Sequence, residues 1–445
     1  FEGYYAKLQS EIEQKSNFEV VMFSDYSVKG AIDFRQQAVD LRCDLDSQKT
    51  SIKYNKCFND IISRDRLLRT LDKNEALLRV KSYYKCFSDY LSKNNIKLIV
   101  SATVDQYFID IVYLLCIENK IKFIGYHISV LPNYLLITAR GESNIISKTN
   151  SLEINKNIKT LSSNSFKPSY IPQKINYSKI FLNRYIKNLF RYIFFSLKKI
   201  QKKSLMHYHI EANVSETKRM TTINVLKGLF FKYDFFDCNN EFLYIPLQFD
   251  PECNGEYWPK ITKYETYNNQ ILNFVKANNT KKIVVREHPN MIGLRESDFY
   301  YKLQKLGASI IHPKESHRDI IKKCKAIVTL NSSVGIEGLF FNKPIICLSK
   351  PYYSSDCHII IDNNSKVSYK EIELVAKRDF KKSLNDSIAI VLKSSLGFSI
   401  PDIRYNENSN DNHYLEDFSK FIINSALNKS EDLIQSDSSN VYSIV

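Results

Sequence analysis

The residues of this chain with the clearest potential for chemistry lie in its second half, directly after short apolar runs. In Arg286-Glu-His-Pro289 the proline stops such a run and turns the chain, which leaves His288 at the point where a strand would end. A histidine placed there can donate a hydrogen bond to a phosphate oxygen. The alternative is a histidine hydrogen-bonded within an ordinary turn, so the motif alone is a weak indication of an anion site.

A second segment, Leu330-Asn-Ser-Ser-Val-Gly-Ile-Glu337, follows another apolar run and has the composition of a helix start. Ser332 or Ser333 is a suitable N-cap, and the free N–H groups of a first helical turn form an anion site. Gly335 would allow a ligand to approach the backbone closely, and Glu337 could accept hydrogen bonds from the ribose hydroxyls. The alternative is that the serines only cap the helix.

We expect this helix to end at Asn342, because asparagine tolerates the left-handed backbone conformation, and we expect Pro344 to lead into the next strand. A His-Pro turn followed by Ser-Ser-x-Gly-x-Glu describes a cradle for a nucleotide. The two motifs in this order are more specific than either motif alone.

Short apolar runs that alternate with helical patterns must position these segments. The pattern is typical of a parallel sheet, whose ligands lie at the carboxyl ends of its strands. The strands predicted in the second half are 242–246, 282–286, 308–312, 326–330 and 344–348.

The first half shows the same alternation. We predict strands at 18–25, 97–101 and 122–127, with helices at 67–91 and 105–118. The first of these strands reads as a buried central one. The sequence therefore predicts an α/β fold with one Rossmann-like domain in each half of the chain.

Between the two halves lies a polar segment and then a basic one. Residues 150–178 are rich in Ser, Asn and Lys and predict an exposed loop. Residues 180–203 predict a basic amphipathic helix, which can lie in the headgroup region of an anionic membrane. An apolar face packed on the core is an equally good explanation. The expected membrane contacts are Arg184, Lys187, Arg191, Lys198 and Lys199.

The composition limits the class of protein. The 445 residues include 63 Lys and Arg against 48 Asp and Glu, a net charge of +15, part of which reflects general enrichment in Lys. Apolar residues make up 44% and charged residues 25%, as in folded soluble proteins. Neither a membrane-spanning stretch nor secretion is expected. The 9 cysteines are widely spaced without a C-x-x-C pair, so a reducing cytoplasm is expected and no metal site is predicted.

The motifs resemble those of the bacterial capsular polysaccharide biosynthesis proteins, a family that includes the Kdo transferases of capsule and lipopolysaccharide assembly. The His-Pro and serine motifs are also similar to those of bacterial sialyltransferases. The segments that carry the resemblance are Tyr244-Ile-Pro-Leu-Gln-Phe-Asp-Pro-Glu252, Arg286-Glu-His-Pro289, Gly293-Leu-Arg295, Phe299-Tyr300, Thr329-Leu-Asn-Ser-Ser-Val-Gly-Ile-Glu337 and Asn342-Lys-Pro344.

The resemblance implies a GT-B-like fold, in which two Rossmann-like domains face each other across a cleft and the C-terminal one holds a nucleotide sugar. The implied donor is a CMP-activated ulosonic acid, either Kdo or a sugar like sialic acid, and neither a metal ion nor another cofactor is expected. By motif, the donor-binding residues would be Gln248, Glu252, Arg286, His288, Pro289, Ser332, Ser333, Gly335 and Glu337.

Glycosyl transfer also needs a carboxylate or a similar base for the acceptor hydroxyl. The first candidate is Asp105, which follows the predicted strand 97–101, with Glu142 and Asp25 behind it. The ordinary alternative for each of them is a solvated loop acid or a helix cap. Inverting and retaining chemistry are not separated by these residues.

The sequence thus predicts a glycosyltransferase of surface polysaccharide biosynthesis, peripheral on the inner face of the cytoplasmic membrane, with a glycan or lipid-linked glycan as acceptor. The predicted division is an acceptor domain 1–178, a linker 179–225, a donor domain 226–400 and a C-terminal helix and tail 401–445.

Two alternatives remain open. A sugar-nucleotide epimerase also uses paired Rossmann-like domains, but it would need no acceptor. The basic charge and the aromatic content would suit a nucleic-acid-binding protein, but the sequence contains no helix-turn-helix or RNA-binding motif, so no nucleic-acid partner is expected.

Overall fold

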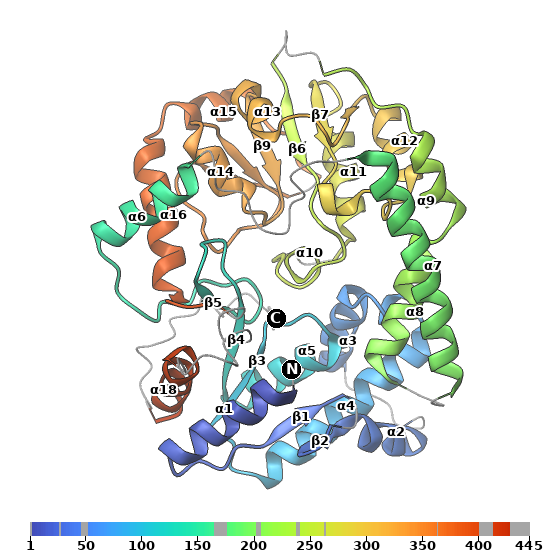
Figure 1. Ribbon diagram of the computed structural model, residues 1–445, viewed down its shortest axis with the longest axis vertical. Coiled ribbons are helices and arrows are strands. Elements are labelled where there is room, and N and C mark those ends of the chain that lie inside the picture. The colour runs from blue at the N-terminus through green and yellow to red at the C-terminus, as the bar shows by residue number, and fades with distance from the viewer. Residues whose placement is uncertain are drawn as a thin grey trace. The chain divides into compact units, whose positions relative to one another are not determined.

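The computed structural model describes residues 2–25, 28–45, 52–163, 176–201, 206–236, 241–261, 264–362, 364–399 and 413–427. The chain forms two compact units, each containing a β-sheet (Figure 1). The first unit comprises Phe1–Thr149, Lys203–Glu211 and Val391–Val445, and the second comprises Asn150–Lys202 and Ala212–Ile390. Both units are therefore discontinuous in the sequence, whereas the sequence analysis expected contiguous domains.

The sheet of the second unit is parallel at every pairing between its described strands. Each strand predicted for this half is present, and one further strand, β11, was missed. The strands, in the order in which they lie in the sheet, are β11 (His358–Ile360), β10 (Ile345–Cys347), β9 (Ala326–Thr329), β6 (Leu243–Pro246), β7 (Ile283–Arg286) and β8 (Ser309–Ile311).

The order of these strands reverses once. The chain runs outward from β6 to β7 and β8, and then returns to β9 on the other side of β6. In open α/β sheets the loops on the two sides of such a reversal separate at the carboxyl ends of the strands, where ligands bind. The fold therefore predicts a ligand site at the loops that follow β6 and β9.

The helices of the second unit include α6, which lies within the segment 150–178 that was expected to be a loop. Asn150 accounts for the helix, because its side chain caps the helix start by accepting a hydrogen bond from the N–H of Glu153 at 2.9 Å. Residues 164–175 of the expected loop lie outside the described residues. The helices are α6 (Ser151–Ser162), α7 (Tyr177–Gln201), α9 (Ile223–Lys227), α10 (Cys253–Glu256), α11 (Tyr267–Ala277), α12 (Ser297–Lys305), α13 (His317–Lys323), α14 (Val334–Phe340) and α15 (Tyr369–Ala376).

Two further helices, α8 (Tyr208–Met220) and α16 (Phe380–Lys393), contribute residues to both units. Helix α14 ends as predicted, since Asn342 has a φ of +52° and the N–H of Lys343 donates to the carbonyl of Gly338 at 3.1 Å.

The first unit has a mixed sheet in the order β12-β5-β4-β3, in which only β3 and β4 are parallel. Its strands are β3 (Leu98–Ala102), β4 (Lys122–Ile128), β5 (Leu135–Ile137) and β12 (Ser395–Leu396), and its helices are α1 (Glu2–Lys15), α2 (Phe34–Leu45), α3 (Ile52–Arg64), α4 (Lys73–Lys93), α5 (Tyr107–Asn119) and α18 (His413–Leu427). The predicted strands 97–101 and 122–127 and the predicted helix 105–118 are confirmed.

The predicted central strand at 18–25 is wrong. Only β1 (Met22–Ser24) forms there, and it pairs with β2 (Ala31–Asp33) in a separate parallel ribbon. The run is divided between two clusters, because the ring centre of Phe23 lies 4.9 Å from that of Phe34, whereas Phe18 and Val20 pack on the buried cluster at the sheet of the first unit.

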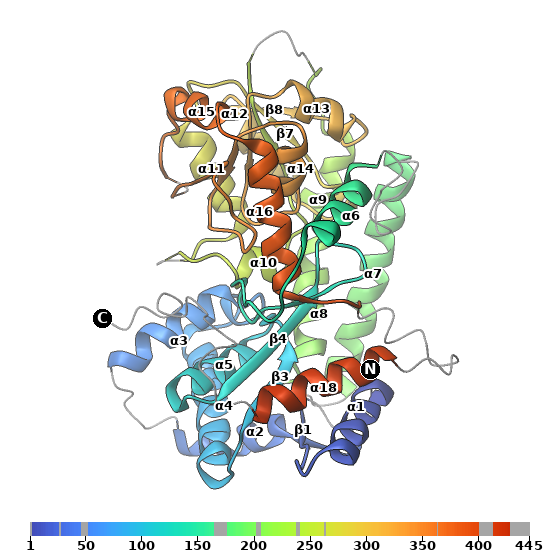
Figure 2. The ribbon, with the colours of Figure 1, turned by 90° about the vertical axis from the view of Figure 1, so that its left-hand side faces the viewer.

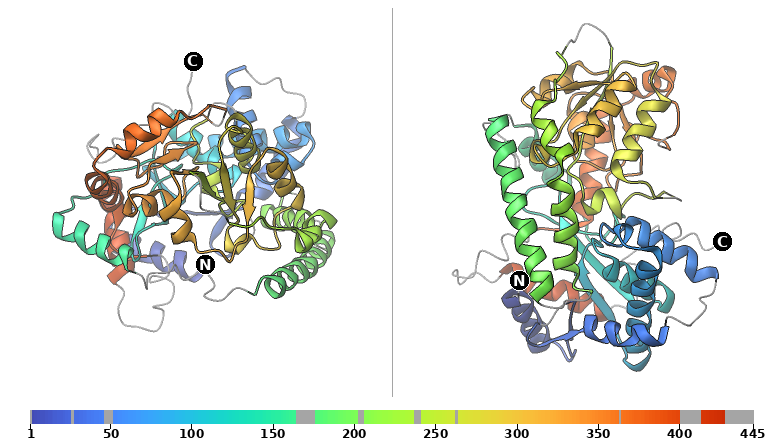
Figure 3. Two further views of the ribbon diagram at one scale, coloured as in Figure 1. Left: turned by 90° about the horizontal axis from the view of Figure 1, so that it is seen from above. Right: turned by 90° about the vertical axis from the view of Figure 1, so that its right-hand side faces the viewer.

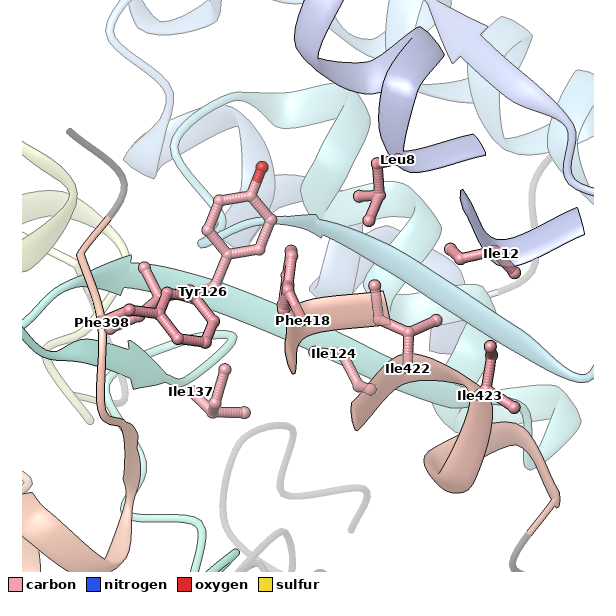
Figure 4. Close-up of a cluster of buried hydrophobic side chains, with 10 residues drawn as sticks. Leu8, Ile12, Ile124, Tyr126, Ile137, Phe398, Phe418, Ile422 and Ile423 are labelled. Atoms are coloured by element: carbon pink, nitrogen blue, oxygen red, sulfur yellow. The ribbon is translucent and has the colours of Figure 1, made fainter. Parts of the chain in front are cut away.

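Both ends of the described chain pack on the sheet of the first unit. Helices α1 and α18 lie side by side (Figure 2), and α18 confirms the C-terminal helix predicted within 401–445. Their apolar residues join those of β4 and β5 in one buried cluster, in which Phe418 packs its ring on Tyr126 (Figure 4). The polar tail expected beyond this helix lies outside the described residues.

Candidate functional site

The segments predicted to bind a donor come together at one edge of the second unit's sheet. Gln248 follows β6, His288 follows β7 and Ser332 follows β9. Strand β6 lies between β7 and β9, and all three run parallel, so their carboxyl ends are neighbours. The structure therefore assembles the cradle that the two motifs predicted from separate parts of the sequence.

Gln248 is the residue at this edge whose surroundings most clearly indicate a ligand site. It is 5% exposed, and within the described part of the chain neither its amide oxygen nor its amide nitrogen has a hydrogen-bond partner. Its backbone is held, since its N–H donates to the hydroxyl of Tyr267 at 2.9 Å. A buried amide without partners costs free energy in the unliganded protein, and a polar ligand would remove that cost.

Asn331 shows the same feature on the opposite side of the strand reversal. It is 5% exposed, and among the described residues its side-chain oxygen has no hydrogen-bond partner. Its side-chain nitrogen donates to the carbonyl of Asn254 at 3.0 Å, which ties the loop after β9 to the loop after β6. Asn331 was not among the predicted donor-binding residues. An amide side chain directly after a predicted buried strand could have indicated it.

A buried ion pair holds the loops after β6 and β7 in register. Glu287 accepts from Arg295 Nε at 2.7 Å, from the Tyr300 hydroxyl at 2.5 Å and from the N–H of His288 at 2.6 Å. Arg295 also donates from Nη2 to the carbonyl of Gln248 at 2.7 Å. One fully buried pair therefore positions both the predicted phosphate ligand and the unpaired amide.

The same guanidinium binds helix α11 and lies over two rings. Arg295 Nη1 donates to the side-chain oxygen of Asn268, and its central carbon lies 5.6 Å from the ring centre of Tyr267 and 5.4 Å from that of Phe299. Glu287 and Arg295 belong to the sequence motifs, but their pairing could not be predicted, because a contact between separate loops leaves no local signal.

His288 is held as a neutral imidazole. Its Nδ1 accepts from the N–H of Asn290 at 3.1 Å, which places the proton on Nε2. Burial, and after it the charges of Arg286 and Arg295, lower the pKa of His288 to about 4. The positive potential that repels a proton here would attract a phosphate.

Arg286 and Pro289, which flank His288 in the same motif, make hydrogen bonds that hold this turn. Arg286 donates from Nε to the carbonyl of Glu315 at 3.0 Å and from Nη2 to that of Pro313 at 2.6 Å, so these donors are engaged within the protein. The carbonyl of Pro289 accepts from Arg184 at 2.9 Å. The structure places both residues beside the site, and their roles in donor binding stay predictions.

The serine segment differs from expectation in two ways. Ser333 is the N-cap of α14, but its backbone is already helical and its hydroxyl makes no capping bond. The N–H of Gly335 donates to the carbonyl of Ser332 at 3.0 Å, so this N–H is engaged within the turn and not free for an anion. Ser332 and Ser333 are both partly exposed, and the hydroxyl of Ser332 accepts from the N–H of Val334 at 3.4 Å. These two hydroxyls can still donate to a phosphate.

The reason for a glycine at position 335 is also different. A Cβ atom there would come within 2.5 Å of the Tyr353 hydroxyl, and that hydroxyl donates to the carbonyl of Ser332. Gly335 is therefore required by packing against Tyr353, which the sequence could not indicate, and not by the approach of a ligand.

Glu337 has an environment that sequence reasoning missed. Its carboxylate lies 3.4 Å from His317 Nε2, and the Nδ1 atom of that histidine lies 2.8 Å from the hydroxyl of the buried Tyr244. The side chain of Glu337 is 42% exposed, so it is held in place by His317 and still accessible to ribose hydroxyls. Glu252 occupies the N-cap of α10, in the loop after β6.

The candidate bases lie in the first unit and differ in environment. Asp105 forms an ion pair with Arg66, and its side chain is 42% exposed. Glu142 is buried and accepts hydrogen bonds from the N–H groups of Ala139 and Arg140 at 2.5 and 2.7 Å. Glu142 thus organises its own loop, whereas Asp105 is accessible.

Asp25 follows β1 and is 8% exposed. Burial, with a smaller contribution from the neighbouring Asp33, raises its pKa to about 6, against the effect of a backbone hydrogen bond. Within the described residues no group of three or more metal-ligating side chains occurs.

The comparisons with known proteins agree with the motifs. The family model of the capsule polysaccharide biosynthesis proteins matches residues 237–371, which contain the loops after β6, β7 and β9. The resemblance predicted from the sequence is thereby confirmed over these residues. No curated protein sequence matches the chain.

Several solved structures are similar to the chain at low identity. KpsC of Thermosulfurimonas dismutans, a beta Kdo 2,7 transferase, is 14% identical with a TM-score of 0.33 over 83% of this chain and 97% of that one. The UDP-GlcNAc 2-epimerase of Neisseria meningitidis is 12% identical with a TM-score of 0.22 over 81% and 96%. That of Methanocaldococcus jannaschii is 12% identical with a TM-score of 0.21 over 78% and 82%.

The ion pair should dominate the stability of the site. We expect Arg295→Met to lower the free energy of unfolding by about 3–5 kcal/mol, because it leaves Glu287 buried without its partner. Lys322→Met is the control, since it removes one partner of the exposed pair with Asp319, whose side chains are 59% and 60% exposed. It should cost about 0–1 kcal/mol. Urea unfolding measures both, and equal losses would contradict the structural role of Arg295.

The pKa of His288 gives a second prediction. In histidine proton NMR titrations one resonance, absent in His288→Gln, should begin to shift only as the pH approaches about 4. Because the unfolded chain takes up this proton first, near the ordinary value of about 6.5, the contribution of His288 to stability is lost as the pH falls from there toward 4. A midpoint for His288 near 6.5 would refute the environment described.

Proposed function

We propose that the protein is a glycosyltransferase of surface polysaccharide biosynthesis and that its second unit binds the nucleotide-sugar donor. The observation that carries this proposal is a set of buried polar atoms on the two sides of the strand reversal that have no hydrogen-bond partner among the described residues: both amide atoms of Gln248 and the side-chain oxygen of Asn331. A polar ligand at that edge would satisfy both. The family match over 237–371 supports capsule polysaccharide biosynthesis as the setting.

The donor we propose is a CMP-activated ulosonic acid, either Kdo or a sugar like sialic acid, bound without a metal ion. His288 would donate its Nε2 proton to the phosphate, the hydroxyls of Ser332 and Ser333 would contact the same group, and Glu337 would accept from the ribose. The field of Arg286 and Arg295 that lowers the pKa of His288 would also favour the phosphate. Gln248 would bind a polar group of the nucleotide, with Glu252 in the same loop.

In the proposed reaction the bond between the anomeric carbon and the phosphate oxygen breaks, and CMP leaves with the electron pair. A hydroxyl oxygen of a glycan or lipid-linked glycan forms the new bond to that carbon. Hydrogen bonds from His288 would stabilise the charge that develops on the leaving phosphate. The hydroxyl proton passes to a carboxylate.

For that carboxylate we propose Asp105, because it is the most accessible of the three candidates. Glu142 has the weaker case, since its oxygens already accept backbone N–H groups. Asp25 has a raised pKa but little exposure. A sugar-nucleotide epimerase is the second candidate function, and it differs in taking a UDP-sugar and no acceptor.

Nucleotide binding should separate these functions. We expect CMP to raise the melting temperature more than UDP, GDP or CDP does. Gln248→Met should weaken CMP binding about tenfold, the equivalent of about 1.4 kcal/mol, while the free protein stays as stable or becomes more stable, because an unpaired buried amide is removed. Isothermal titration and urea unfolding measure the two effects.

Gln270→Met is the matched control. Gln270 is also buried, and among the described residues its side-chain oxygen likewise has no partner, but its amide nitrogen donates to the carbonyl of Glu265 at 2.7 Å. Losing that hydrogen bond should lower stability and leave CMP affinity unchanged. A response to UDP with release of an epimerised sugar and no acceptor would support the epimerase. No response to any nucleotide, in a folded protein, would refute the proposal.

The base is tested by transfer rates. With a CMP-activated ulosonic acid and a glycan acceptor, Asp105→Asn should lower kcat by about 10²–10⁴-fold with little change in CMP affinity. Asp25→Asn should keep most of the activity, and Glu142→Gln should lose stability in urea unfolding. Full activity of the Asp105 variant would assign the role to another group.

A further inference from the structure

Helix α7 presents a long apolar face that no other described part of the chain covers. Phe190 is 66% exposed, Phe194 56%, Leu197 55% and Ile200 75%. Leu182, Ile186, Leu189 and Ile193 are each at least 39% exposed and, by helical spacing, lie on the same side. Figure 3 shows α7 as one unbroken helix.

The opposite face of α7 is packed on the second unit. Phe181, Asn188 and Phe195 are its buried residues, and they recur at heptad spacing. Phe181 packs with Val225 and Ile292 in a small cluster. The exposed face is therefore the outer side of a helix that is already anchored.

Arg184 and Arg191, two of the cations expected to contact a membrane, instead make hydrogen bonds that anchor α7. Arg184 donates to the carbonyls of Pro289 and Ile292 at 2.9 and 3.2 Å, and Arg191 donates to the side-chain oxygen of Asn213 at 2.6 Å. These two guanidinium groups have structural contacts within the unit. Lys187, Lys198 and Lys199 are the remaining candidates, and Lys187 and Lys199 are exposed.

Lys187 and Lys198 flank the exposed face. Helical spacing places both on the same side of it, and the ammonium of Lys198 lies 5.4 Å from the ring centre of Phe194. A shallow groove between this flank and the apolar face is lined by Asn183, Ile186, Lys187, Phe190, Arg191 and Phe194. Long lysine side chains can cover apolar surface and still reach a charged layer above it.

The charge of α7 identifies what fits this face. Its 25 residues contain Lys179, Arg184, Lys187, Arg191, Lys198 and Lys199 but neither Asp nor Glu. A second copy of the chain would bring the same cations against these, without a carboxylate on either helix to pair with them. An anionic lipid surface supplies both an apolar layer and negative charge in a plane.

We propose that the outer face of α7 docks on the surface of an anionic membrane. Phe190, Phe194 and Leu197 enter the boundary between headgroups and acyl chains, and Lys187 and Lys198 contact lipid phosphates. Among the described helices none is long and apolar enough to cross a bilayer. The helix therefore lies in the plane of the interface.

Vesicle co-sedimentation of the full chain tests this proposal. The protein should bind vesicles of phosphatidylglycerol and phosphatidylcholine, bind pure phosphatidylcholine at least tenfold more weakly, and dissociate as the salt concentration rises. The double change Phe190→Asn with Phe194→Asn, and separately Lys187→Gln with Lys198→Gln, should each weaken binding at least tenfold. These side chains are on the outer face of the helix, so the melting temperature should not change.

Phe235→Asn is the matched control, because Phe235 is 90% exposed but lies outside α7, and it should leave vesicle binding unchanged. Equal binding to neutral vesicles, or anionic binding that neither double variant weakens, would overturn the proposal. A dimer in size-exclusion chromatography that becomes a monomer on Phe190→Asn with Phe194→Asn would also overturn it and would assign the face to a second copy.

Discussion

The ion pair between Glu287 and Arg295 is the interaction on which the geometry of the candidate site depends. Both residues are fully buried, and removing two charges from water is costly unless every donor and acceptor finds a partner. The partners are drawn from the segments that need to be placed: the N–H of His288 and the carbonyl of Gln248. Because the buried pair needs both partners, it holds the loop after β6 and the loop after β7 at a defined distance. The sheet alone would not couple these two loops.

A second constraint comes from close packing around glycine. Gly293 has a φ of +77°, and a Cβ atom there would come within 2.9 Å of the carbonyl oxygen of Phe181 in α7. Gly338 would bring a Cβ atom into the side chain of Ile327 in β9. These contacts place one helix against the turn that carries His288 and another against the strand that precedes Ser332, so the two halves of the cradle rest on rigid elements.

The sequence was a good guide wherever the physics is local. Buried parallel strands read as short apolar runs, so each strand from β6 to β10 was found, and the left-handed conformation of Asn342 follows from its type. The same reasoning failed at 18–25, because an apolar run whose side chains are shared between two clusters looks like a run that fills the interior of a sheet. The prediction of a loop at 150–178 was also wrong where α6 forms.

The site was predictable in its motifs and not in its contacts. His288 and Glu337 stand out by type and position, but the partners that hold them, Asn290 for one and His317 with Tyr244 for the other, come from folding. Gly335 was selected for the wrong reason, since Tyr353, which requires it, follows only after the next strand. Residues 391–399 and α18 belong to the first unit although they follow the second in the sequence, and local sequence patterns could not predict this.

The contact between Arg184 and the turn after β7 has a thermodynamic consequence. Arg184 joins α7 to the carbonyls of Pro289 and Ile292, so the helix with the exposed apolar face also supports the backbone beside His288. If occupation of that face changes the equilibrium position of the helix, it changes the affinity of the turn for a phosphate. Reciprocity then requires that the phosphate alter the affinity of the helix for its surface by the same factor. One arginine would make the two binding events a single linked equilibrium.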